Sequence, residues 1–208
     1  MPEKIYPFWE QNENKNKPMI EDVMPHYLTG DNLKIALEFM AYLRENKIKP
    51  TWSLLNGWKG VCKGKVLYWI RLPQVKSNTD AEEPTHCHFR NIKQSNKINW
   101  TNSWVITPYF NHIAMYENTI ISDGLDNFFL ENIHPCRPNC GSEMKNPRKK
   151  SCMPGINKTL FGKEAHGICR SDLYNTMTAW FVNPNETEAR QIKRLLELET
   201  QARKNTQN

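Results

Sequence analysis

Apolar residues recur every three or four positions between residues 31 and 46, which is the spacing of one face of an α-helix. The members of this stripe are Leu33, Ala36, Leu37, Met40 and Leu43. Asp31 stands at its start as an N-cap, and Pro50 follows shortly after its end. We therefore predict a helix over 31–46.

After Pro50 the pattern of hydrophobic and polar residues changes from the helical period to a period of two, which predicts a β-meander. Strands are expected at 51–55, 58–62 and 65–72, with two-residue turns at 56–57 and 63–64. In the third strand, Val66, Tyr68, Ile70 and Leu72 share one face, whereas Lys65, Leu67, Trp69 and Arg71 share the other. If no helix covers the face with Trp69 and Arg71, it is a ready binding surface.

The remaining elements alternate between strands and helices. We expect a strand over 103–107 that ends at Pro108, a helix with Ser122 as its cap, a strand over 173–182 and a closing helix with Asn183 as its N-cap. This order predicts an α+β fold, in which a mostly antiparallel β-sheet carries helices packed on one face.

A chain of 208 residues suits one domain with sizeable insertions. We expect an N-terminal extension over 1–30 and a single α+β domain over 31–208, with insertions at 73–99 and 134–171. Apolar residues make up only 38% of the chain, but seven Trp and eight Phe provide enough bulk for a packed core.

The net charge of +6 is concentrated in the second insertion. Between residues 134 and 170, eight Lys or Arg accompany two Glu, so this segment alone accounts for the net charge. Lys149 and Lys150 lie within it and are candidate contacts for nucleic-acid phosphates. A solvated loop explains the same run, and no recognition helix accompanies it, so nucleic-acid binding is an alternative function.

The first 19 residues contain no apolar stretch of signal-peptide length. The longest apolar run, 66–70, is far too short to span a membrane. We therefore expect a cytoplasmic protein without a membrane partner.

Four of the six cysteines lie in the basic insertion: Cys136, Cys140, Cys152 and Cys169. Thiols in a reducing compartment stay free, bind metal or carry out redox chemistry. A segment rich in Pro, Gly, Asn and Lys buries little apolar surface, and a zinc ion held by four thiolates supplies the missing folding free energy. We predict that these four cysteines bind zinc and staple the insertion, whereas buried free thiols or disulfides are the alternatives. A redox- or metal-responsive protein is accordingly a second alternative function.

The same insertion resembles a family of small bacterial proteins of unknown activity. The resemblance rests on Cys-Met-Pro-Gly at 152–155, Thr-Leu-Phe-Gly-Lys-Glu at 159–164 and Ile-Cys at 168–169. It extends over about 31–196 and implies a shared topology and a bacterial source, but no activity. Ala165 stands where the family tends to carry an aromatic residue, and the 73–99 segment is longer here.

Five side chains on or beside the predicted strands are candidates for an aromatic ligand pocket: Trp58, Trp69, Arg71, Trp104 and Tyr109. Core packing is the alternative role for most of them. We find no Ser-His-Asp order with supporting turns, no paired carboxylates in an apolar setting and no metal-hydrolase helix motif. The sequence therefore favours a non-enzymatic binding module for a small ligand or a partner protein.

Overall fold

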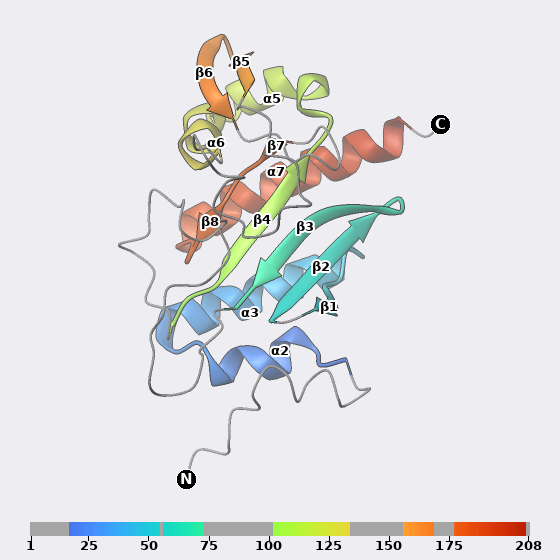
Figure 1. Cartoon of the computed structure of the whole chain (residues 1–208), viewed down its shortest axis with the longest axis vertical. Coiled ribbons are helices and arrows are strands. Elements are labelled where there is room, and N and C mark those ends of the chain that lie inside the picture. Colours follow the sequence, from blue (N-terminus) through green and yellow to red (C-terminus); the bar gives the residue numbers. More distant parts are fainter. Residues whose placement is uncertain (1–16, 55, 73–101, 134–155, 169–176, 207–208) are drawn as a thin grey trace, which may run out of the picture.

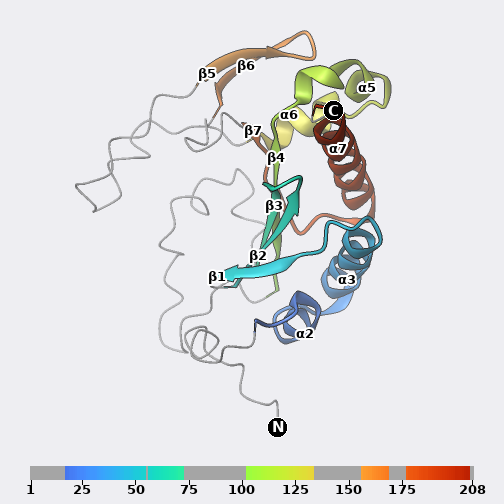
Figure 2. The same ribbon diagram turned by 90° about the vertical axis from the view of Figure 1, so that its right-hand side faces the viewer.

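The computed structural model describes residues 17–54, 56–72, 102–133, 156–168 and 177–206. In these ranges the chain forms one six-stranded antiparallel sheet, with helices on one of its faces (Figures 1 and 2). A separate two-stranded hairpin lies beyond one end of the sheet. The predicted α+β fold is confirmed.

The sheet has the strand order β1-β2-β3-β4-β7, and β8 also pairs with β4. Its strands are β1 (Thr51–Leu54), β2 (Gly57–Cys62), β3 (Lys65–Arg71), β4 (Val105–Phe110), β7 (Met177–Thr178) and β8 (Phe181–Val182). Lys63 and Gly64 join β2 to β3 with φ values of 51° and 75°. Two positive φ values in a two-residue hairpin match the twist of the flanking strands, so the predicted meander forms with the predicted turn.

The helices are α2 (Ile20–Val23), α3 (Gly30–Glu45), α5 (Glu117–Ser122), α6 (Asp126–Asn132) and α7 (Glu186–Asn205), with short 3₁₀ turns η1 (Met24–His26) and η3 (Ile113–Met115). Helices α3 and α7 lie side by side against one face of the sheet, to its right in Figure 2. Lys34 pairs with Glu186 near the start of both helices, and further along the Tyr42 hydroxyl donates to the Lys193 carbonyl. The two helices therefore run in the same direction.

Two predicted helix caps are each wrong by two positions. Thr29 precedes α3, and Asp31 lies in its first turn, where its charge still favours the helix dipole. The N-cap of α7 is Asn185, which forms a reciprocal capping box with Glu188. Asn183 is not the cap because its side chain accepts a hydrogen bond from the Trp104 amide and is committed to the start of β4.

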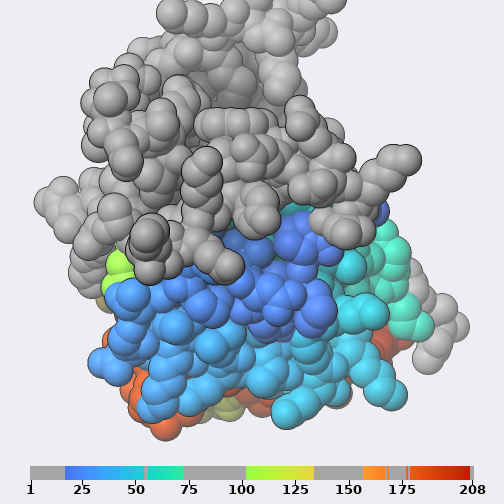
Figure 3. Space-filling view, turned by 90° about the horizontal axis from the view of Figure 1, so that it is seen from below, coloured from blue at the N-terminus to red at the C-terminus, as the bar shows by residue number. Residues whose placement is uncertain are grey.

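Part of the expected N-terminal extension belongs to the core. Ile20, Met24 and Leu28 are completely buried. Glu21 of α2 forms an ion pair with Arg44 of α3, which fixes the short helix against the long one. Together α2 and α3 form the blue surface seen in Figure 3.

The helix-covered face of the sheet is the apolar one. A row of cross-strand neighbours runs across it from Trp58 through Ile70 and Ile106 to Phe181, and all four are buried. Tyr68 lies beside this row and donates its hydroxyl to the Ile48 carbonyl at the end of α3. Apolar burial and this hydrogen bond together attach the helices to the sheet.

Strand β4 does not end at Pro108, contrary to the prediction. It continues to Phe110, and Pro108 pairs with Tyr68 of β3. On its other side, β8 pairs with Val105 and Ile106, and β7 pairs with Tyr109 and Phe110. Proline is tolerated here because the neighbouring strand is interrupted opposite it, so no ladder hydrogen bond is lost.

The predicted cap at Ser122 is also wrong, because Ser122 ends one helix, α5, and does not begin the next, α6. Ser122 is the last residue of α5, and its hydroxyl donates to the Thr119 carbonyl. Gly124 follows with a φ of 67°, a conformation that glycine adopts without steric cost and that ends α5 before α6 begins.

The described part of the basic insertion is the hairpin of β5 (Ile156–Leu160) and β6 (Lys163–Ile168). The Phe161 amide donates to a Glu117 side-chain oxygen, and the Phe161 ring contacts Phe129 edge-on. Lys163 Nζ lies 2.7 Å from Asp126 Oδ2. The turn of the hairpin is thus anchored to α5 and α6 (Figure 1).

Within the described ranges, the structure contains no helix that is both long enough and apolar enough to cross a membrane.

The close approach of Tyr68 to β2 gives a direct test of this packing. A Cβ atom at Gly60 would lie 2.2 Å from two carbon atoms of the Tyr68 ring. Because Tyr68 is completely buried, its ring cannot move aside, and we expect Gly60→Ala to lower the free energy of unfolding by about 1–3 kcal/mol. Val61→Ala, at an exposed neighbour in the same strand, should change it by roughly 0.5 kcal/mol or less. Urea denaturation measures both, and equal effects would contradict the close packing.

Candidate functional site

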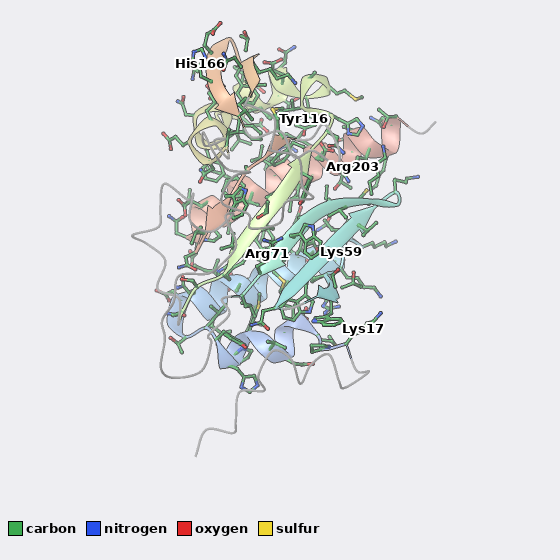
Figure 4. All side chains as sticks on the ribbon, viewed as in Figure 1. Lys17, Lys59, Arg71, Tyr116, His166 and Arg203 are labelled. Carbon is green, nitrogen blue, oxygen red and sulfur yellow. The ribbon has the colours of Figure 1, made fainter. Side chains whose placement is uncertain are left out.

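The second face of the sheet carries two cations and an indole. The register places Lys59 of β2 directly opposite Trp69 of β3, and Trp69 opposite Thr107 of β4. The Arg71 guanidinium lies over the Trp69 ring, 5.6 Å from its centroid. Figure 4 shows Lys59 and Arg71 on this side of the sheet, with α3 and α7 behind it. We call Lys59, Trp69, Arg71 and Tyr109 the sheet-face cluster.

The guanidinium of Arg71 interacts with the Trp69 ring. Its stacking on the indole is a cation–π contact, and such contacts become stronger away from water. Burial lowers the pKa of Arg71, although the nearby Tyr109 phenol opposes that effect. The charge of Arg71 therefore lies in a setting less polar than water, where an anion would be attracted more strongly.

The floor around the cluster is apolar. Val105 and Val182 are 3% and 5% exposed and are cross-strand neighbours on this face. Arg71 lies opposite Val105 in the next strand. Cations above a buried aliphatic floor form a surface suited to a ligand with both an anionic and an apolar part.

The other two predicted aromatic residues lie elsewhere. Trp58 and Trp104 are completely buried. Trp58 belongs to the helix-covered face and donates its indole N–H to the Pro18 carbonyl, and Trp104 packs on Phe39 of α3. The structure thus brings together Trp69, Arg71 and Tyr109 and separates them from Trp58 and Trp104.

The remaining predicted site residues lie outside the described residues. These are Cys136, Cys140, Cys152, Cys169, Lys149 and Lys150. Cys62 is described and is a buried free thiol in β2. The described ranges hold no group of three or more His, Cys, Asp or Glu side chains placed to bind a metal.

A buried charge cluster was not predicted from the sequence. Glu199 of α7 is completely buried and Arg203 is 2% exposed, and Arg203 Nε donates to Glu199 Oε1 at 2.7 Å. The other Arg203 nitrogens donate to the carbonyls of Lys65, Val66 and Tyr109. One side chain thereby joins α7 to both β3 and β4.

Both oxygens of the Glu199 carboxylate accept hydrogen bonds. It accepts from the backbone amides of Asn111 and His112 at 3.2 Å each, and from the Tyr116 hydroxyl at 2.7 Å. His112 Nδ1 lies 3.0 Å from Glu199 Oε1. The pKa of Tyr116 is raised by burial and by the charge of Glu199, so the phenol remains a donor.

This charge cluster is structural in character, because its carboxylate has no contact with solvent and each oxygen is already occupied. One signal in the sequence pointed to it. Glu199 and Arg203 continue the apolar stripe of Ile192, Leu195 and Leu196 at helical spacing, so both charges face the core. Charged residues four positions apart on an apolar stripe indicate a buried pair.

Searches against protein-family models, curated proteins and solved structures found no match to this chain. The resemblance to a bacterial family therefore stays a prediction.

The buried charge cluster predicts that removing its carboxylate lowers the free energy of unfolding much more than removing an exposed carboxylate of the same helix. Glu199→Gln removes the negative charge and leaves the Arg203 guanidinium buried and unpaired, which should cost about 3–5 kcal/mol. Glu197→Gln, at an exposed position of the same helix, should cost roughly 0.5 kcal/mol. Guanidinium chloride denaturation compares the two. A similar loss for both variants would show that the pair does not hold α7 in place.

Proposed function

We propose that the protein is a non-enzymatic binding module that uses the sheet-face cluster to hold an anionic ligand. The observation that supports this most directly is the combination of Lys59, Arg71 and Trp69 on a sheet face that α3 and α7 do not cover. None of the described strand positions paired with these residues on this face is acidic.

The chemistry of the two cations favours carboxylate or phosphate. A guanidinium presents a planar fork of donors that matches the paired oxygens of such groups. Lys59 adds a second charge that forms no ion pair with any residue in the described ranges. The indole between them offers a flat apolar surface, so the ligand class we favour is a small anion with a planar or apolar body.

Ligand binding is tested through the tryptophan itself. Titration with a panel of aromatic carboxylates and nucleotides should quench part of the intrinsic fluorescence, and Trp69→Ala should remove that response. Arg71→Gln and Lys59→Gln should each weaken binding by about five- to twentyfold, which corresponds to roughly 1–2 kcal/mol. Lys34→Gln, on the helix side of the molecule, is the matched control and should bind normally. Unchanged affinity in the Arg71 variant would contradict the proposed site.

We further propose that Cys136, Cys140, Cys152 and Cys169 bind zinc and hold the basic insertion together. The hairpin supports this part of the proposal. Ile156 and Ile168 are register partners across β5 and β6. Cys152 and Cys169 lie four and one residues beyond these paired positions, so chain length alone limits their Cα atoms to about 20–25 Å of each other. Closure of the hairpin thus limits how far apart the last two cysteines of the set can lie, which is compatible with a shared metal ion.

The zinc proposal predicts a defined stoichiometry. Protein purified under reducing conditions should contain one zinc per chain, and chelation should release it and expose four additional thiols to titration. Cys152→Ser should abolish the bound zinc, whereas Cys62→Ala, which removes the buried thiol of β2, should retain it. Six thiols that titrate in denaturant, without bound metal, would refute the zinc site. Fewer than six in denaturant, again without metal, would indicate disulfides and support the redox alternative, since the buried Cys62 thiol is then also accessible.

A further inference from the structure

Three segments that are far apart in the sequence meet at one end of the molecule, where α3 and α7 end beside the turn between β2 and β3. Arg203 Nη1, near the end of α7, donates to the Lys65 and Val66 carbonyls just after that turn, at 3.3 and 3.0 Å. The carbonyl of Ile48, which follows α3, accepts from the Tyr68 hydroxyl of β3. Figures 1 and 2 show the three segments on the same side of the molecule.

Each of these segments contributes exposed lysines. There are five, and we call them the lysine patch: Lys47, Lys49, Lys63, Lys65 and Lys204. None of them forms an ion pair with a residue that the structure describes. Lysines elsewhere on the described surface do form such pairs, as Lys34 does with Glu186.

The charge at this end of the molecule is positive. Residues 45–50, 62–66 and 200–206 contain one acidic residue, Glu45, at the end of α3. Glu197, earlier on α7, already pairs with an arginine of its own helix. The C-termini of α3 and α7 each add about half a negative charge, so an excess of roughly three positive charges remains in these segments.

Two members of the patch have backbone conformations that suit other residue types better. Lys47 has a φ of 60° and Lys63 a φ of 51°, in the left-handed region that residues with a Cβ atom seldom adopt. Lys47 follows α3 at the position where a helix usually has glycine, and its amide donates to the Arg44 carbonyl. Lys63 is the first residue of a two-residue turn, where asparagine is preferred. The local backbone thus does not explain a lysine at either position.

Attraction to helix ends explains part of the patch. Lys47 and Lys204 lie at the C-termini of α3 and α7, where a positive charge stabilises the helix dipole. Lys63 lies in a strand turn, and it forms no ion pair with a described residue. A partner outside the chain accounts for the lysine at this position.

The chemistry of the patch favours the phosphates of a nucleic-acid duplex. Ammonium groups pair with phosphates as point charges, and the two arginines at this end, Arg44 and Arg203, already pair with glutamates. The large apolar side chains exposed in the described ranges belong to four different elements, and only Val61 lies within two residues of the patch, which leaves it without the apolar anchor of a membrane-binding surface. No aromatic side chain is exposed in these ranges, so unstacked bases of a single strand have no platform.

We infer that the lysine patch binds the phosphate backbone of double-stranded nucleic acid without regard to base sequence. Its ammonium groups neutralise phosphates and release the counterions that surround them, so binding weakens steeply as salt is added. This surface uses no residue of the sheet-face cluster and no residue of the basic insertion.

Fluorescence anisotropy of the full chain with labelled DNA and RNA duplexes of about 20 base pairs tests this inference. Duplexes of unrelated sequence should bind with similar affinity, and the logarithm of the binding constant should fall against the logarithm of the salt concentration with a slope of about −3 to −4.5. The more tightly bound of the two duplexes identifies the source of the phosphates. Absent or salt-independent binding, or tighter binding of the single strands, would overturn the inference. Binding to phosphatidylserine vesicles but not to duplexes would assign the patch to a membrane instead.

Variants at the two left-handed positions separate a binding role from a structural one. Lys47→Gly and Lys63→Asn each introduce the residue type that the backbone favours, so the melting temperature should stay the same or rise. Each should nevertheless weaken duplex binding about threefold or more and make the salt slope shallower by about 0.9. A fall in melting temperature would overturn the account of these positions, and unchanged affinity would overturn the binding surface.

Lys65→Gln and Lys204→Gln repeat the binding test at exposed positions without a left-handed backbone, and each should weaken binding to a similar extent. The matched control is Lys34→Gln, which removes an exposed charge at the other end of α3 and should leave affinity unchanged. An equal loss in the control would show that net charge alone is responsible. A loss confined to a double Lys149→Gln and Lys150→Gln variant would assign binding to the insertion, and either result would overturn the inference.

Discussion

The position of the last helix depends on a pair of charges that have no contact with water. Arg203 bonds to three strand carbonyls and to Glu199, and Glu199 in turn accepts from the backbone that follows β4. A buried pair of this kind gains little over an apolar pair when it is complete, but it is very costly when one member is missing. Any displacement of α7 along its axis would break several of these bonds at once. The apolar contacts supply most of the stabilisation, and the charged pair determines which register of helix on sheet is allowed.

Much of the fold follows from local pattern. The helical stripe of 31–46 and the alternation through 51–72 each repeat often enough to specify an element, and both elements formed within one or two residues of the expected bounds. The caps were less predictable, since several Asn and Asp residues near each helix start are chemically capable of capping. Asn183 does not cap α7, because its side chain forms a hydrogen bond with a residue eighty positions away in the chain.

The candidate site was predictable only in part, and for a geometric reason. Alternation along one strand correctly placed Trp69 and Arg71 on the same face. Alternation within one strand does not show which residues of two neighbouring strands lie opposite each other. That depends on the pairing register, which shifts between Gly60 and Val61. Trp58 therefore lies on the core face, opposite Ile70, although it is as aromatic and as strand-like as Trp69. Trp104 precedes β4, so no alternation applies to it.

Pro108 has a consequence for how the sheet behaves toward other molecules. Opposite it, the outermost strand is divided into β7 and β8, each two residues long. A continuous outer strand offers an uninterrupted row of amide and carbonyl groups on which a second chain can grow as cross-β structure. Here that row is broken after two residues, and Ala179 between the two pieces is already bridged to Ile133. A single missing amide hydrogen in the neighbouring strand thus makes this border of the sheet a poor template for aggregation.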